Sequence, residues 1–165
     1  MFLVNWFSGW SPELATLVIA AIPVGELRVS LPVALTVYHL DFWPAFILSV
    51  FGTLTAAIVV MAVLDPITRF ARKYSQPINR ALEWLFRRTR KKHQSKFEKY
   101  RDLTLILFVA IPLPFTGAYT GALAAYVFGV PFRRAFPLIA IGVIIAAAIV
   151  TAVTLGFKSA IYMVF

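Results

Sequence analysis

Apolar stretches of two lengths alternate with polar breaks along this chain. The first half contains two short runs, Leu14–Ile22 and Val29–Tyr38, followed by Trp43–Leu64, a run of 22 residues without a charge. A helix of about 20 apolar residues crosses the hydrocarbon core of a membrane, and the short runs are about half that length. The pattern therefore predicts one full span preceded by two short helical stretches.

The second half repeats this order with the short runs Leu103–Ile111 and Ala122–Val130 and the long run Ala135–Phe157. Individual residues also match, which indicates an internal duplication. Ala21-Ile22-Pro23 matches Ala110-Ile111-Pro112 at an offset of 89, whereas Ala45-Phe46 and Gly52 match Ala135-Phe136 and Gly142 at an offset of 90.

We therefore expect a single all-α integral membrane domain over 1–165. Repeat 1 covers about 14–64, a basic connector covers 65–102, and repeat 2 covers about 103–157. Hairpin breaks are expected where proline and glycine disfavour helix, at Pro23, Gly25, Pro32, Pro112, Pro114, Gly117 and Gly121. The short runs of each half form either one kinked crossing helix, which gives parallel repeats, or a re-entrant hairpin, which gives inverted repeats.

The distribution of charge favours the inverted arrangement. Residues 65–102 hold 12 of the 16 lysines and arginines, a bias typical of a cytoplasmic loop. Re-entrant hairpins place Arg133 and Arg134 on that same side, whereas four crossing helices place them outside. Apolar residues at helical spacing over 78–86 predict an amphipathic cytoplasmic helix between the halves. The expected membrane-surface basic residues are Arg87, Arg88, Arg90, Lys91, Lys92, Arg133 and Arg134.

Composition excludes several functional classes. The 165 residues are 61% hydrophobic and 14% charged, a balance foreign to most soluble enzymes. With no cysteine and two histidines, we expect no metal site and no cofactor. No catalytic constellation is present, so we do not expect an enzyme. Because a cytoplasmic loop accounts for the basic block, we expect no nucleic-acid partner.

The candidate substrate-binding residues are polar groups at membrane depth. Glu26 and Arg28 are costly to insert there, at roughly 2.5–3.5 kcal/mol each. Arginine suits a phosphate or carboxylate, because its planar fork bonds two oxygens at once. Thr116, Tyr119 and Thr120 offer hydroxyl groups at the corresponding break of the second half. The alternatives are a structural ion pair for the two charges and local bonding within the helix for the threonines.

Two segments resemble a known family. Ile22-Pro23-Val24-Gly25-Glu26-Leu27-Arg28 with Pro32, and Ile111–Leu123 with Phe132-Arg133-Arg134-Ala135-Phe136, are similar to the small multi-drug export proteins of prokaryotes. The chain also resembles, more distantly, the DedA superfamily with its VTT-domain scramblases. That resemblance implies re-entrant hairpins that meet at mid-membrane, and movement of lipids. In the DedA pattern an arginine follows the proline of the second hairpin, whereas here Arg28 lies in the first.

We therefore expect a small transporter or lipid flippase for an amphiphilic, phosphate-bearing molecule, with proton coupling through Glu26 compatible with this role. The alternatives are an exporter of cationic drugs or metabolites, and a non-transporting scaffold or assembly protein that binds anionic lipid through the connector. The expected location is the prokaryotic cytoplasmic membrane, with several passes. The expected partners are membrane lipids and a second copy of the chain, because one copy is small for a closed pathway.

Overall fold

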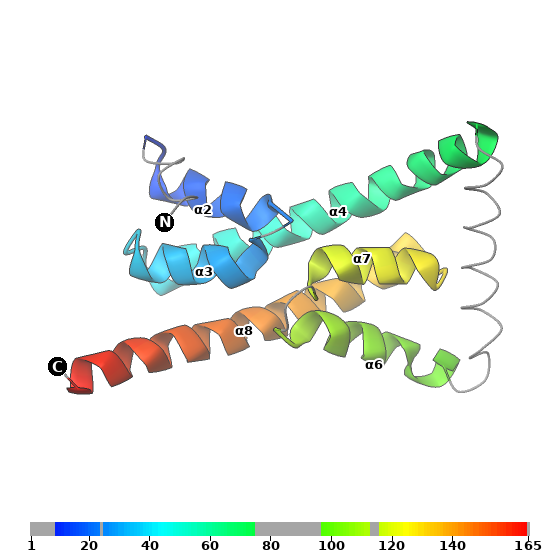
Figure 1. The fold of residues 1–165 in the computed structure, drawn as a ribbon. Coiled ribbons are helices and arrows are strands. Elements are labelled where there is room, and N and C mark those ends of the chain that lie inside the picture. Colours follow the sequence, from blue (N-terminus) through cyan, green and yellow to red (C-terminus); the bar gives the residue numbers. More distant parts are fainter. Residues whose placement is uncertain (1–8, 24, 75–96, 113–115, 165) are drawn as a thin grey trace.

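The computed structural model describes residues 9–23, 25–74, 97–112 and 116–164, and all regular structure in these ranges is helical. The prediction of an all-α protein is therefore confirmed. The helices, with the labels of Figure 1, are α2 (Pro12–Ala21), α3 (Glu26–Thr36), α4 (Phe42–Tyr74), α6 (Phe97–Ala110), α7 (Ala118–Val127) and α8 (Phe132–Val164). The amphipathic helix expected near 78–86, the basic residues Arg87, Arg88, Arg90, Lys91 and Lys92, and the break at Pro114 lie outside the described residues.

Helices α2 and α3 fold back on each other as a hairpin, hairpin 1, and α6 and α7 form hairpin 2 (Figure 1). The start of α2 is set by Ser11, whose hydroxyl accepts a hydrogen bond from the Leu14 amide at 3.3 Å, and by Pro12 in its first turn. Its last residue is Ala21, two positions before Pro23. The ends of the two hairpins, where α2 meets α3 and where α6 meets α7, are called the tips, and they face each other at the centre of the molecule (Figure 1).

The two long helices, α4 and α8, run in opposite directions past these hairpins (Figure 1). Helix α2 packs on α4, and α6 packs on α8. Two stretches, Phe42–Thr68 and Phe132–Gly156, are long and apolar enough to cross a membrane. Large apolar side chains such as Phe51, Val59 and Ile144 are exposed on them. An apolar surface of this kind suits a lipid environment.

Matching positions of the long helices are buried in both halves. In α4 the fully or largely buried residues include Ala45, Ser49, Gly52, Thr53, Ala56 and Ala57, and in α8 they include the residues 90 positions later, Ala135, Ile139, Gly142, Val143, Ala146 and Ala147. A Cβ on Gly52 would overlap with the Leu17 carbonyl and Ala20. A Cβ on Gly142 would overlap with Val109 and crowd the Ile106 carbonyl. The two helix pairs therefore share one mode of close packing.

The links into the long helices also correspond. His39 and Gly129, again 90 positions apart, both have left-handed backbone, with φ of 52° and 69°. The first turns that follow are closed by equivalent hydrogen bonds, from Ala45 to the Asp41 carbonyl at 3.1 Å and from Ala135 to the Pro131 carbonyl at 2.9 Å. Glycine adopts this backbone without a steric cost, and histidine is among the residues that tolerate it.

Two of the expected hairpin breaks are wrong. Pro32 lies inside α3 and Gly121 lies inside α7. Pro32 removes one backbone hydrogen bond, but its neighbours Leu31 and Ala34 are fully buried, and this packing holds the helix together. Gly121 provides space, because a Cβ there would overlap with Val109 of α6. Gly117 and the buried Ala125 continue the same face, so this small-residue stripe packs helices closely.

The long helix of the first half extends further than the apolar run predicts. It continues through Asp65 and Pro66 to Tyr74, and α6 already begins at Phe97. Both ends of the expected connector are therefore helical: 65–74 belong to α4 and 97–102 belong to α6. Arg134 at the start of α8 bonds Asp102 of α6, with 2.6 Å between Nη2 and Oδ2. Arg133 beside it is exposed.

Candidate functional site

The two hairpin tips are joined by the carboxylate of Glu26, the first residue of α3. Its Oε2 accepts a hydrogen bond from the Ala118 amide at 3.2 Å, and its Oε1 accepts one from the Tyr119 amide at 3.1 Å. Both amides belong to the first turn of α7, where backbone N–H groups have no partner within the helix. Glu26 therefore caps a helix of the other hairpin and interacts favourably with the positive end of its dipole.

Local backbone geometry makes this contact possible. Gly117 precedes α7 with a φ of 154° and provides no side-chain cap, so the first amides of the helix are open to an outside acceptor. A Cβ at position 117 would overlap with the Glu26 carboxylate. Glu26 itself has a left-handed φ of 45°, uncommon for a residue other than glycine. Backbone strain of this kind tends to cluster at functional sites.

Arg28 binds the other side of the same tip. Its guanidinium donates to the Thr116 carbonyl, to the Thr116 hydroxyl at 2.9 Å and to the Ile111 carbonyl at 3.2 Å. Ile111 and Thr116 lie outside the helices, between α6 and α7. Backbone carbonyls without a helical partner need another donor where water is excluded, and Arg28 supplies it. Glu26 and Arg28 thus bind opposite kinds of backbone group on one segment, amides and carbonyls.

Of the three remaining predicted residues, Tyr119 and Thr116 bond between the two hairpin tips, and Thr120 bonds locally. Tyr119 reaches back to hairpin 1, where its hydroxyl donates to the Ala21 carbonyl. The Thr116 hydroxyl donates to the Ile111 carbonyl at 2.9 Å as well as accepting from Arg28. Thr120 donates to the Gly117 carbonyl at 3.2 Å within its own turn. Four of the five predicted residues therefore meet, and the described bond of Thr120 is local.

Glu26, Arg28, Thr116 and Tyr119, with the backbone groups of 111, 116, 118 and 119 that they bind, are called the tip site below. Glu26 is only 6% exposed, and Arg28 is partly buried. Burying a carboxylate this deeply is costly unless it is hydrogen-bonded, which the two amides achieve. Within the described ranges, no group of three or more His, Cys, Asp or Glu residues could hold a metal ion.

Sequence reasoning identified the polar side chains but missed their backbone partners. The amides of Ala118 and Tyr119 and the carbonyls of Ala21 and Ile111 belong to apolar or aromatic residues and leave no compositional signal. The signal that could have indicated these partners is the start of α7 after Gly117. A glycine-preceded helix start without a Ser, Thr, Asp or Asn cap requires an acceptor from elsewhere in the fold.

An apolar outer surface, two helices able to cross a membrane and a buried polar contact between two hairpins define a small helical membrane protein. Comparison with family models identifies its family. Residues 26–149 match the model described as "Putative small multi-drug export protein". The match covers most of the chain, begins at Glu26 and includes the tip of hairpin 2. The chain belongs to this family. Comparisons with curated proteins and with solved structures gave no match.

Proposed function

We propose that this protein is a small transporter of the prokaryotic cytoplasmic membrane that moves a phosphate-bearing amphiphile, such as a lipid, past the tip site. In this proposal the halves are inverted repeats, and each contributes one re-entrant hairpin and one full span. The opposed directions of α4 and α8 support this arrangement, as do the matching buried positions. With 10 or 11 residues each, α2, α3 and α7 are about half as long as a membrane core requires.

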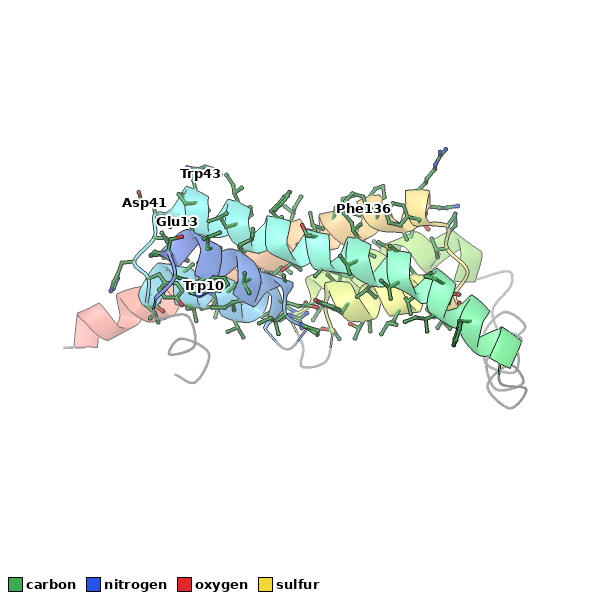
Figure 2. All side chains as sticks on the ribbon, turned by 90° about the horizontal axis from the view of Figure 1, so that it is seen from above. Trp10, Glu13, Asp41, Trp43 and Phe136 are labelled. Atoms are coloured by element: carbon green, nitrogen blue, oxygen red, sulfur yellow. The ribbon has the colours of Figure 1, made fainter. Side chains whose placement is uncertain are left out.

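The charges at the two ends support the proposed orientation. Arg133 and Arg134 lie at the end where α8 begins, and the basic connector leaves α4 and enters α6 at the same end (Figure 1). Trp10, Glu13, Asp41 and Trp43 gather at the opposite end (Figure 2). Exposed tryptophans are typical of a membrane–water interface. The basic end is then cytoplasmic and the acidic end external.

The observation that carries the proposed substrate class is a carboxylate held by two helix-terminal amides beside an arginine. Helix N-termini bind phosphates and carboxylates, and arginine adds a planar pair of donors. In this structure Glu26 fills the amide site. A substrate phosphate would exchange with that carboxylate, taking the amides of Ala118 and Tyr119 and a share of Arg28. An acidic side chain that leaves an anion site can accept a proton, so this exchange is compatible with proton coupling.

Transport also requires the two hairpins to separate, because the bonds of Glu26, Arg28 and Tyr119 close the centre of the molecule. The site therefore acts as a gate as well as a binding position. The family description suggests export of drugs. Within that class, export of cations is less favoured by the contacts. The Glu26 carboxylate is already satisfied by two donors, and Arg28 adjoins it.

Membrane lipids and a second copy of the chain are the proposed partners. Membrane lipids contact the apolar faces of α4 and α8, and a homodimer completes a pathway that one small copy encloses poorly. The hairpins that meet at their tips support the distant relationship to the DedA and VTT-domain proteins. Neither an enzymatic activity nor a cofactor is part of this proposal.

The test is transport by purified protein in proteoliposomes. The probes are a short-chain fluorescent phosphatidic acid and the cation ethidium. Arg28→Gln is expected to reduce movement of the phosphatidic acid at least about tenfold, since a bidentate charged contact contributes about 1.5–3 kcal/mol. Thr120→Val is the matched control at the same depth and should remain near normal. Normal phosphatidic acid transport by Arg28→Gln, or transport of ethidium alone, would contradict the proposal.

A further inference from the structure

Two serine hydroxyl groups in the first half are buried without a hydrogen-bond partner. Ser30 in α3 and Ser49 in α4 are both 0% exposed, and neither Oγ bonds another group. A buried hydroxyl without a partner costs about 1–3 kcal/mol, and such groups in native proteins are commonly satisfied by buried water.

These serines differ from most of the described helical threonines. Six described threonines donate to the carbonyl four residues earlier, the default for a hydroxyl in an apolar helix: Thr16, Thr36, Thr55, Thr68, Thr151 and Thr154. Ser30 and Ser49 have the same option, yet both hydroxyls point elsewhere. Their orientation indicates a polar partner away from their own backbone.

Both serines lie one helical turn from the level of the tips. Ser30 is four residues after Glu26 on the buried side of α3. Ser49 is four residues before Thr53, and the Thr53 hydroxyl donates to the Ala20 carbonyl near the end of α2 at 3.3 Å. Helices α2, α3 and α4 pack against one another. The two hydroxyls are therefore at similar depth on packed helices, on the side of the tip that faces the α3–α4 link.

The second half has no such feature at the equivalent positions of α8. Ser49 corresponds to Ile139 and Thr53 corresponds to Val143, and both of these apolar residues are fully buried. At these two positions α4 therefore carries buried hydroxyl groups, whereas α8 carries hydrocarbon. Polar side chains at these buried positions of one long helix only point to a role for that helix.

We propose that Ser30 and Ser49 line a small water-binding pocket between α2, α3 and α4, and that this water connects Glu26 to the proposed external end. The inference rests on the proposed function, and it names the path by which a coupling proton reaches the tip site. Among the described residues, the charged and titratable groups that face Glu26 are Arg28 on its own helix and Tyr119 on α7. The described membrane-depth segments of α4 and α8, 42–64 and 135–156, contain no charged residue.

The chain contains no cysteine, so single substitutions report on each position alone. Ser30→Cys and Ser49→Cys are treated with the small water-soluble reagent 2-aminoethyl methanethiosulfonate in proteoliposomes. Both should react roughly tenfold or more faster than Ile139→Cys, because a thiol in apolar surroundings forms the reactive thiolate less readily. Val143→Cys is a second apolar control. Equal rates at all four positions would overturn the proposed pocket.

The double substitution Ser30→Ala with Ser49→Ala tests the proton path separately. Phosphatidic acid uptake driven by a pH gradient should fall at least about fivefold, whereas exchange of the probe without a gradient should persist, because only the gradient-driven reaction needs protons. Thr151→Val, which removes a buried hydroxyl with a local partner, should leave both reactions intact. Unchanged gradient-driven uptake by the double variant would overturn the path. If the native protein moves no probe at all, the proposed function fails, and the cysteine rates still decide on the pocket.

Discussion

Gly117 lies directly against the carboxylate of Glu26, although the two residues belong to different hairpins and different halves of the chain. The missing side chain lets the carboxylate reach the amides at the start of α7. Three conditions therefore coincide at one point: a backbone conformation that favours glycine, a helix start without its own cap and a buried charge. The following predictions test this contact and the packing that supports it.

Gly117→Ala should destabilise the protein by about 1–3 kcal/mol, because a Cβ overlaps with the Glu26 carboxylate and the φ of 154° is strained for alanine. The apparent melting temperature in detergent measures the effect. Gly156→Ala is the matched control, since Gly156 has no atom near its added Cβ. Equal melting temperatures for the two variants would show that Gly117 and Glu26 do not pack as described.

Glu26→Gln should release the start of α7. A glutamine amide lacks the negative charge and replaces one of the two acceptor oxygens with an NH2 donor, so it cannot offer a separate oxygen to each of Ala118 and Tyr119 as the carboxylate does. Hydrogen exchange of a peptide covering 116–127, followed by mass spectrometry, should become faster, and that of a peptide in α8 should not change. Unchanged exchange over 116–127 would mean that these amides have another partner.

Gly52→Ala and Gly142→Ala should each lower stability by about 1–3 kcal/mol, the usual range for overpacking a close helix contact. Each added Cβ would overlap with the first helix of its own half, at Ala20 or at Val109. Thermal unfolding in detergent should show similar losses for the two variants. A large loss for one and none for the other would contradict the equivalence of the two packing contacts.

Arg134→Gln should change stability by less than about 1 kcal/mol, because the Arg134 and Asp102 side chains are 52% and 33% exposed. The apparent melting temperature in detergent measures this change. Added salt should make the difference in melting temperature between the variant and the native protein smaller still. A loss as large as that of Gly117→Ala would show that this pair holds α6 and α8 together.

The sequence predicted the helices well because its signals were local. Apolar run length, proline position and the matched residues at offsets of 89 and 90 correspond to packed helices in both halves. Pro32 and Gly121 were misjudged because a helix held by packing tolerates residues that break an isolated one. The direct contact of Glu26 with Ala118 could not be predicted, since a backbone amide carries no residue-specific signal and the two residues are 92 positions apart.

The described hydrogen-bond partners of the Glu26 and Arg28 side chains all lie on the second hairpin, and this has a consequence for how the chain can evolve. The two halves, which we propose to be repeats, differ at their tips: one tip supplies charged side chains and the other supplies backbone. The two tips are therefore complementary parts that cannot substitute for each other. A chimera of two first halves would confront two arginines and two glutamates and would lack the open amides that Glu26 needs.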